Sequence, residues 1–493
     1  MPEIPFDNSY ARLPERFFSQ RQPTPVAQPG PVRVNHELAV LLGIDPAWLE
    51  SDEGTAVLAG NSIAQGSDPI ATVYAGHQFG SYNPQLGDGR AILLGEVIGS
   101  DGIRYDIQLK GSGPTPYSRG GDGRAPLGAV LREYIVSEAM HTLGIPTTRA
   151  LAAVTTGEKV MRESFLPGAI LTRVASSHIR IGTFQFFAAR QDTEALELLV
   201  EHVLARHYPK ADTGDNPALA LLDQMVSAQA SLVAKWQLLG FIHGVMNTDN
   251  MLLSGDTIDY GPCAFMDDFD PARVFSSIDH AGRYAYGNQP GIAHWNLAAL
   301  AQALLPILHD DQEQAVALAQ GVVDTFPHRF ASAHRAGLAH KLGMAELRET
   351  DQPLADQLFE TMAQYQLDFT LTFRRLADLA GAGEGDGDAT VAQLFEVPDP
   401  LLPWLARWRE RLAQEASSAA ERQALMYVAN PVFIPRNHLV EEALAAASDE
   451  RDLGPFNALV DVLAQPFSYD ARFARFATPP RPEQVVRQTF CGT

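Results

Sequence analysis

Three neighbouring residues near the middle of the chain have side chains suited to holding a metal ion and moving a proton. In "HGVMNTDNML" and the "IDYGP" that follows it, Asp249 and Asn250 are adjacent, and Asp259 comes shortly after them. Amide and carboxylate oxygens are the ligands that Mg²⁺ takes in proteins, with phosphate oxygens and water completing its octahedron. Each motif alone is typical of a turn. Their joint spacing from His243 instead predicts that Asn250 and Asp259 bind magnesium, which would neutralise charge at phosphorus.

The same stretch has the spacing of a protein kinase catalytic loop without its usual base. Kinases place His-Arg-Asp before an Asn that binds magnesium, and Asp-Phe-Gly after a short strand. Here Asn250 follows His243 at the kinase spacing and Asp259 opens "DYG", but Val245 stands where the catalytic Asp would be. An isopropyl group accepts no proton. The only other carboxylate in the loop is Asp249.

Positively charged side chains upstream predict a phosphate site. Lys110 ends a predicted strand and precedes a Gly-Ser-Gly loop, where a kinase has the Lys that binds ATP phosphates. The sequence "GDGRA" occurs at 87–91 and again at 121–125; its glycines free the backbone to approach phosphate, and each copy supplies an Arg. Arg173 and Arg180 lie in an apolar segment. Together with Lys110 they predict a cationic pocket that suits a triphosphate.

Two elements must position Lys110 and its partner. "RAILLGEVI" and "IRYDIQLK", separated by "GSDG", predict a β-hairpin whose second strand is half-buried. Pro126 opens a predicted helix that Gly144 ends. Spacing from Lys110 favours Glu133 of this helix as the ion-pair partner, whereas the 3.6-residue period puts Glu138 on the apolar face. The pattern leaves both alternatives open.

The composition bounds the class of protein and its partners. The chain has 493 residues, 46% of them hydrophobic, with 37 basic and 59 acidic residues and a net charge of −22. Such an acidic balance argues against a nucleic-acid partner held by phosphate contacts. The N-terminus lacks a secretory apolar run, and no stretch approaches 18 uninterrupted apolar residues. We therefore expect a cytoplasmic protein without a membrane span, and a monomer.

The motifs resemble those of the selenoprotein O family. The segments that carry the resemblance are "YAGHQFGSYNPQLGDGR", "QLKGSGPTPYSRGGDGRAPLG", "HGVMNTDNML" and "IDYGP", and the similarity covers essentially the whole chain. The resemblance implies an α+β, protein-kinase-like bilobal fold with a mixed β N-lobe and a mainly helical C-lobe. We expect an N-terminal extension at 1–65, the N-lobe at 66–185, the C-lobe with extra helices at 186–480, and a C-terminal tail at 481–493.

The resemblance also implies an activity. Members of the family transfer AMP from ATP to the hydroxyl side chains of Ser, Thr or Tyr in other proteins and release pyrophosphate, and some use UTP and Mn²⁺. The nucleotide is bound in a flipped orientation, which explains why a kinase base is not needed at Val245. Asp249 resembles the proton acceptor, and Asn250 and Asp259 resemble the metal ligands. The positions that resemble the nucleotide contacts are Gly87, Gly89, Arg90, Lys110, Asp122, Gly123, Arg173, Arg180 and Asp259.

Two other functions fit the same residues. One is a conventional phosphotransferase in which Asp249 replaces the missing base, and the other is a non-catalytic, ATP-binding pseudokinase that works as a scaffold. The family often ends in a redox-active selenocysteine or cysteine, and Cys491 matches that feature. Cys263 is the only other cysteine in the chain. A regulatory disulfide between Cys263 and Cys491 is therefore a hypothesis.

Overall fold

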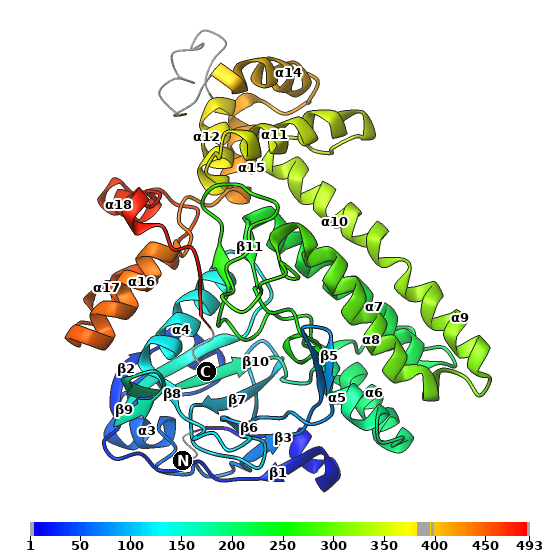
Figure 1. Cartoon of the computed structure of the whole chain (residues 1–493), viewed down its shortest axis with the longest axis vertical. Helices are drawn as coiled ribbons and strands as arrows, with labels where there is room; N and C mark the ends of the chain where they lie inside the picture. The colour runs from blue at the N-terminus through cyan, green and yellow to red at the C-terminus, as the bar shows by residue number, and fades with distance from the viewer. Residues whose placement is uncertain (1–3, 382–394, 396–398, 491–493) are drawn as a thin grey trace.

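The computed structural model describes residues 4–381, 395 and 399–490. Within them, an antiparallel eight-stranded sheet occupies one end of the molecule and helices extend away from it, so the fold is α+β as predicted (Figure 1). The strands lie in the order β1 (Phe18–Gln20), β3 (Ile70–Thr72), β6 (Ala91–Ile98), β7 (Arg104–Lys110), β10 (Phe165–Ala175), β9 (Arg149–Met161) and β2 (Gly30–Val34), and β8 (Ala125–Pro126) pairs with β10.

The predicted hairpin is confirmed as β6 and β7, and β7 lies in the middle of the sheet. The prediction that β7 is only half-buried is wrong. Asp106 and Gln108, on its polar face, are as buried as the apolar residues of the other face. They remain inside because each has a charged partner: Asp106 binds Arg206, and Gln108 accepts two hydrogen bonds from Arg173. The polar face of β7 therefore contacts buried arginine side chains rather than solvent.

The predicted helix after Pro126 is confirmed as α4 (Leu127–Thr142), and Gly144 beyond its end has a positive φ of 76°. The helix lies between the sheet on one side and α16 (Asn437–Ala445) and α17 (Gly454–Leu463) on the other. Leu131 and Tyr134 are buried in that interface, and the Tyr134 ring meets Phe456 edge to face at 5.6 Å. Helix α4 is thus buried on two faces.

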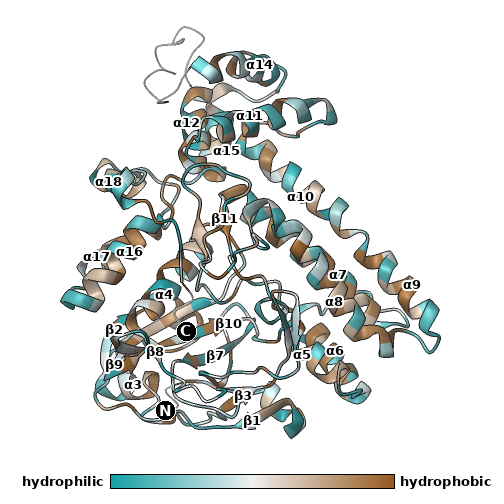
Figure 2. Cartoon of the chain, in the orientation of Figure 1, coloured by the Kyte–Doolittle hydropathy of each residue, from teal (hydrophilic) through white to brown (hydrophobic). Residues whose placement is uncertain are grey.

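A long helix forms the centre of the helical part of the molecule. Helix α7 (Pro217–Leu239) packs against α6 (Thr193–His207), α8 (Gln289–Leu308), α9 (Gln312–Val323) and α10 (Phe326–Lys341). Their apolar sides face inward and their polar sides face outward (Figure 2). The end of α7 runs through β11 (Phe241–Ile242), which pairs with β12 (Ala264–Phe265), into the loop that contains the predicted site residues.

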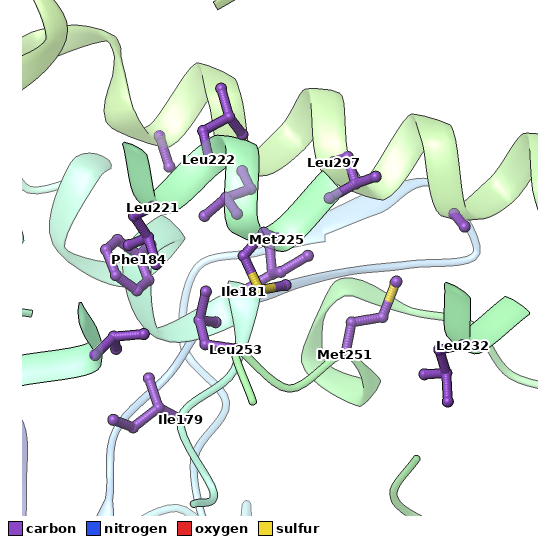
Figure 3. Close-up of a cluster of buried hydrophobic side chains, with 14 of the residues drawn as sticks. Ile179, Ile181, Phe184, Leu221, Leu222, Met225, Leu232, Met251, Leu253 and Leu297 are labelled. Atoms are coloured by element: carbon purple, nitrogen blue, oxygen red, sulfur yellow. The ribbon is translucent and has the colours of Figure 1, made fainter. Parts of the chain in front are cut away.

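A buried apolar cluster packs against the chain next to that loop (Figure 3). It joins α7, α8, α5 (Ile181–Ala188) and the chain just after the loop. The residues that contribute are Ile179, Ile181, Phe184, Leu221, Leu222, Met225, Leu232, Met251, Leu253 and Leu297. Burying one side chain of this size stabilises the fold by about 1.5–3 kcal/mol. The cluster therefore holds the backbone on either side of the loop in place.

The predicted N-terminal extension contributes two strands, β1 and β2, to the edges of the sheet, together with α1 (His36–Leu41), α2 (Pro46–Leu49) and α3 (Asp52–Leu58). At the other end of the chain, further helices belong to the buried apolar clusters that contain α10 or α4. They are α11 (Gln352–Gln364), α12 (Phe369–Gly381), α14 (Leu402–Leu412), α15 (Ala419–Ala429) and α18 (Ala474–Ala477). Among the described residues, one segment, Tyr286–Leu308, is long and apolar enough to cross a membrane by composition alone, and half of it is buried in the protein.

Candidate active site

Asp259 lies at the centre of a cluster of three cations, of which Arg173 and Arg180 are buried and Lys110 is partly buried. Its Oδ1 atom is 2.8 Å from Lys110 Nζ and 2.6 Å from Arg173 Nη1, and its Oδ2 atom is 2.8 Å from Arg180 Nη1. Lys110 comes from β7, Arg173 from the neighbouring β10, and Arg180 from the residue that caps α5. Burial would raise the pKa of Asp259, but the three cations outweigh burial and hold the pKa well below its usual range.

The backbone of Asp259 has a φ of 63°, in the left-handed region. Among residues with a side chain, Asp and Asn tolerate this conformation best. The preceding Ile258 is buried, and its carbonyl oxygen lies 2.9 Å from His243 Nε2. The turn therefore lets Ile258 stay in the core while the next side chain enters the cleft.

The structure decides between the two candidate partners of Lys110. Glu133 Oε2 lies 2.5 Å from Lys110 Nζ, and Glu133 Oε1 lies 3.1 Å from Arg173 Nη1. Glu138 instead binds Arg149 and Asn35, away from the cations. Because α4 is buried on two faces, the spacing of its apolar residues does not indicate which of the two carboxylates points toward the site. Glu133 is the ion-pair partner.

The loop around Asn250 is held by its own hydrogen bonds. Asn250 Nδ2 donates to the carbonyl oxygen of Val245 at 2.9 Å. His243 is buried and its ring lies 5.4 Å from that of Trp236. Val245 is buried, and its apolar side chain forms part of the wall of the cleft.

Asp249 is a buried carboxylate with one unused oxygen. Gln78 Nε2 donates to Oδ2 at 3.1 Å, whereas Oδ1 is buried without a hydrogen-bond partner among the described residues. Burial raises the pKa of Asp249 to about 6, against the opposing influence of Arg180. Asp249 lines the cavity described below, so its carboxylate is near enough to a bound ligand to accept a proton from a hydroxyl group.

Every site residue predicted from the sequence lines one cavity of about 990 Å³. They are Gly87, Gly89, Arg90, Lys110, Asp122, Gly123, Arg173, Arg180, Asp249, Asn250 and Asp259. The volume is at the upper end of that of pockets for small molecules and cofactors. The structure therefore brings together, in one cavity, residues that are up to 172 positions apart in the sequence (Gly87 and Asp259). Their individual roles remain predictions.

The two "GDGRA" segments have different local roles. Asp88 of the first copy is buried and accepts hydrogen bonds from Thr72, so it holds the turn together. Asp122 of the second copy is exposed and binds Arg162 at 2.9 Å. Arg124 of the second copy lines the cavity and donates to the carbonyl oxygens of Thr24 and Pro25. The two copies therefore differ in their hydrogen bonds, although both line the cavity.

Close backbone packing explains the glycines of these segments better than phosphate approach alone. A Cβ atom on Gly87, whose φ is 126°, would lie 2.5 Å from the Tyr117 ring. A Cβ atom on Gly123, whose φ is 66°, would lie 2.1 Å from the carbonyl group of Gly113. Both turns thus pack directly on the loop that follows β7.

Asn250 and Asp259 fit a divalent metal ion as a partial ligand set. Since the Asn250 amide nitrogen is already bound, its oxygen is the atom left to coordinate. In the described part of the chain no group of three or more His, Cys, Asp or Glu side chains is arranged to hold a metal. These two oxygens therefore suit an ion whose other ligands come from a phosphate chain and water.

The tail of the chain reaches the same cavity. Thr489 Oγ1 donates to the carbonyl oxygen of Pro262 at 2.5 Å, its amide donates to Phe275 O at 2.7 Å, and Phe490 lines the cavity. Cys263 is buried next to this contact. Cys491 lies outside the described residues, so its pairing with Cys263 remains a hypothesis.

Sequence reasoning missed the short hairpin of β4 (Gly76–Gln78) and β5 (Ser81–Asn83), which supplies Gln78, and it missed Tyr74. Arg180 stacks over the Tyr74 ring at 4.7 Å. Both residues lie within "YAGHQFGSYN", a segment that the motif comparison singled out without a role. Its three-residue strands are too short and too polar to predict from alternation.

Comparison with known proteins agrees with the geometry. Residues 2–464 match the family model described as "Protein adenylyltransferase SelO". Similar proteins called "Protein nucleotidyltransferase YdiU" occur in Bradyrhizobium sp. (strain BTAi1), with 59% identity over 490 residues, and in Rhodopseudomonas palustris (strain BisB18), with 58% over 490. A third, in Methylorubrum extorquens, is 59% identical over 494 residues. Each comparison covers 99% of both chains.

Proposed function

The chain belongs to the protein adenylyltransferase SelO family and is a nucleotidyltransferase, and we propose that it transfers AMP from ATP to Ser, Thr or Tyr hydroxyl groups of other proteins. Pyrophosphate is the second product, and UTP can replace ATP as a donor of UMP. The observation that carries this proposal is the combination, in one cavity, of three cations around Asp259 with the carboxylate of Asp249.

The cationic cluster is suited to a nucleotide's phosphate chain. Lys110, Arg173 and Arg180 face two carboxylates, Glu133 and Asp259, which leaves an excess of one positive charge before any ligand binds. Arg173 and Arg180 are buried and Lys110 is partly buried, so salt screens their attraction for phosphate only weakly. Gly87, Gly89, Arg90, Asp122 and Gly123 line the same cavity and complete the proposed nucleotide contacts.

Asn250 and Asp259 would hold Mg²⁺ or Mn²⁺, and the bound ion would neutralise charge on the phosphates and on the leaving pyrophosphate. Asp259 binds three cations in the structure. A metal ion bound to this carboxylate would weaken its ion pairs with the three cations. The cations would then be available to bind the phosphates of the nucleotide. The proposed order of events is therefore that nucleotide and metal bind together.

Asp249 is the proposed proton acceptor. The hydroxyl oxygen of the acceptor protein attacks the α-phosphorus, a new O–P bond forms, and the bond between the α-phosphorus and the bridging oxygen breaks. The bonding electrons leave with pyrophosphate, and the hydroxyl proton passes to the Asp249 carboxylate. A carboxylate with its pKa raised to about 6 by burial is ionised at neutral pH and is a stronger base than an exposed Asp.

The proposal includes a protein-kinase-like, bilobal arrangement with the boundaries expected from the sequence, 66–185 and 186–480 for the lobes. Support comes from the antiparallel sheet with α4 packed on it, from the Lys110–Glu133 ion pair, and from the helical region around α7. We also propose that the protein is a cytoplasmic monomer, for which its acidic, soluble-type composition is the support.

Incubation of the purified protein and acceptor proteins with ATP labelled at the α or the γ position tests the proposed reaction. We expect label to reach protein from the α position alone. Transfer from the γ position alone would identify a conventional phosphotransferase. ATP binding without transfer from either position would identify a pseudokinase scaffold. A variant without the carboxylate, Asp249→Ala, should bind ATP and transfer no label.

A further inference from the structure

The β4–β5 hairpin lies directly against the three residues that end in the proposed proton acceptor. The amide of His77 donates to Thr248 Oγ1 at 2.7 Å, and the amide of Phe79 donates to Asn247 Oδ1 at 3.1 Å. Between them, the Gln78 side chain donates to Asp249 Oδ2 at 3.1 Å. Consecutive residues of the hairpin thus bind consecutive residues of the loop.

Asp249 is held between two residues of this hairpin. A Cβ atom on Gly76 would lie 2.7 Å from Asp249 Oδ1 and 3.0 Å from Asp249 Cβ. The carboxylate therefore has no room to move toward Gly76, while Gln78 fixes its other oxygen. Under this constraint Oδ1 stays buried and without a hydrogen-bond partner in the described structure.

The hairpin is itself anchored to two helices. Gln185 of α5 binds both His77 Nδ1 and Thr248 Oγ1, at 2.8 and 2.7 Å. The His77 ring also lies 5.2 Å from that of Trp295 in α8. These contacts do not involve Gln78, which is only partly buried. The Gln78 side chain is therefore not needed to keep the hairpin in place.

We propose that Gln78 is a positioning residue for the transfer reaction: by donating to Asp249 Oδ2 beside the cavity, it fixes the rotation of the carboxylate that accepts the proton. This inference rests on the proposed function, in which Asp249 accepts the proton. Gln78 supplies a hydrogen-bond donor that restricts the rotation of the carboxylate. It does not touch the reacting atoms.

Replacement of Gln78 by residues of similar shape tests the proposal. Gln78→Met keeps the volume and removes the donor, and Gln78→Glu puts an acceptor where the donor was. We expect kcat for AMP transfer to fall about tenfold to a hundredfold in Gln78→Met, and at least as far in Gln78→Glu. The KM for ATP and the melting temperature should stay at wild-type values. Gln320→Leu, an exposed substitution on α9, is the control.

Three results would overturn the inference. The first is a wild-type kcat in Gln78→Met. The second is a tenfold or larger rise in the KM for ATP with an unchanged kcat. The third is a loss of activity that is accompanied by a matching fall in melting temperature. Gly76→Ala, which crowds Asp249 while keeping Gln78, is the second variant and should lower kcat in the same way. If Asp249→Ala retains full activity, or if label leaves ATP from the γ position, the proposed function fails instead, whatever Gln78 does.

Discussion

Arg173 Nη1 lies 2.6 Å from Asp259 Oδ1, although the two residues are 86 positions apart in the chain. Arg173 is almost completely buried in the sheet, and Asp259 enters the cleft from the loop after the helical core. Their ion pair therefore joins the two halves of the site. The same carboxylate is the one that we assign as a metal ligand. The negative charge of Asp259 therefore affects both the binding of the three cations and the binding of the metal ion.

Asp259→Asn should separate these two effects. Removing the negative charge releases Lys110, Arg173 and Arg180, so we expect ATP binding without metal to be kept or strengthened. Transfer with Mg²⁺ should fall by about a hundredfold or more, because a metal ligand is lost. Binding of a fluorescent ATP analogue in chelator and in Mg²⁺, together with α-label transfer, measures both. Undiminished transfer with magnesium would contradict the assignment, and exposed Asp310→Asn is the control.

Glu133→Gln and Glu138→Gln should have different consequences although both remove one carboxylate from α4. Glu133 binds Lys110 and Arg173, so its loss should weaken transfer by about tenfold or more by misplacing the cations. Glu138 binds Arg149 and Asn35 outside the cavity. Its loss should lower stability by about 1–3 kcal/mol and leave the KM for ATP unchanged. Steady-state kinetics and urea unfolding of both variants check this, and equal kinetic losses would refute it.

The identities of Lys110, Asn250 and Asp259 were predictable because motif spacing along the chain carries them. The choice between Glu133 and Glu138 was not. Helical periodicity reports which face of a helix is apolar, and α4 is buried against the sheet on one side and α16 and α17 on the other. On a helix buried on two faces, the sequence does not distinguish a glutamate in the site, such as Glu133, from one in a structural ion pair, such as Glu138.

The hairpin that carries Gln78 was not predictable for a different reason. Its strands have three residues each and are stabilised by contacts with Asn247, Thr248 and Asp249 rather than by an apolar face. The burial of Asp106 and Gln108 was missed in the same way, because their partners come from distant segments. Non-local polar contacts of this kind have no period in the sequence.

Gly123→Ala should disrupt the loop that lines the cavity, and the chain offers a matched control in Gly120→Ala. Both glycines have positive φ, 66° and 83°. An added Cβ at Gly123 would lie 2.1 Å from the carbonyl group of Gly113, whereas at Gly120 nothing lies within 4 Å. We expect Gly123→Ala to weaken ATP binding by about tenfold or more and to cost about 2–4 kcal/mol of stability, against about 1 kcal/mol for Gly120→Ala. Calorimetric titration with ATP and thermal unfolding measure the difference; equal effects would show that backbone strain alone matters.

Lys341 should make stability depend on pH. Its ammonium group is buried at the end of α10, 4.2 Å over the ring of Phe373, and no carboxylate among the described residues forms an ion pair with it. Burial lowers its pKa from 10.5 to about 7. Between these two pKa values, Lys341 is protonated in the unfolded chain and largely neutral in the folded one. Its contribution to stability therefore rises with pH from about 7 to about 10. Below pH 7 the contribution is least favourable.

Lys341→Met removes the charge and keeps an unbranched chain in the aromatic pocket. Because each pKa unit corresponds to about 1.4 kcal/mol, we expect this variant to be more stable than the wild type by a few kcal/mol at pH 6. The difference should shrink steadily at pH 8 and 9. Urea unfolding of both proteins at these pH values measures it, with exposed Lys210→Met as the control. A difference that does not change with pH would mean that Lys341 keeps its proton in the folded protein.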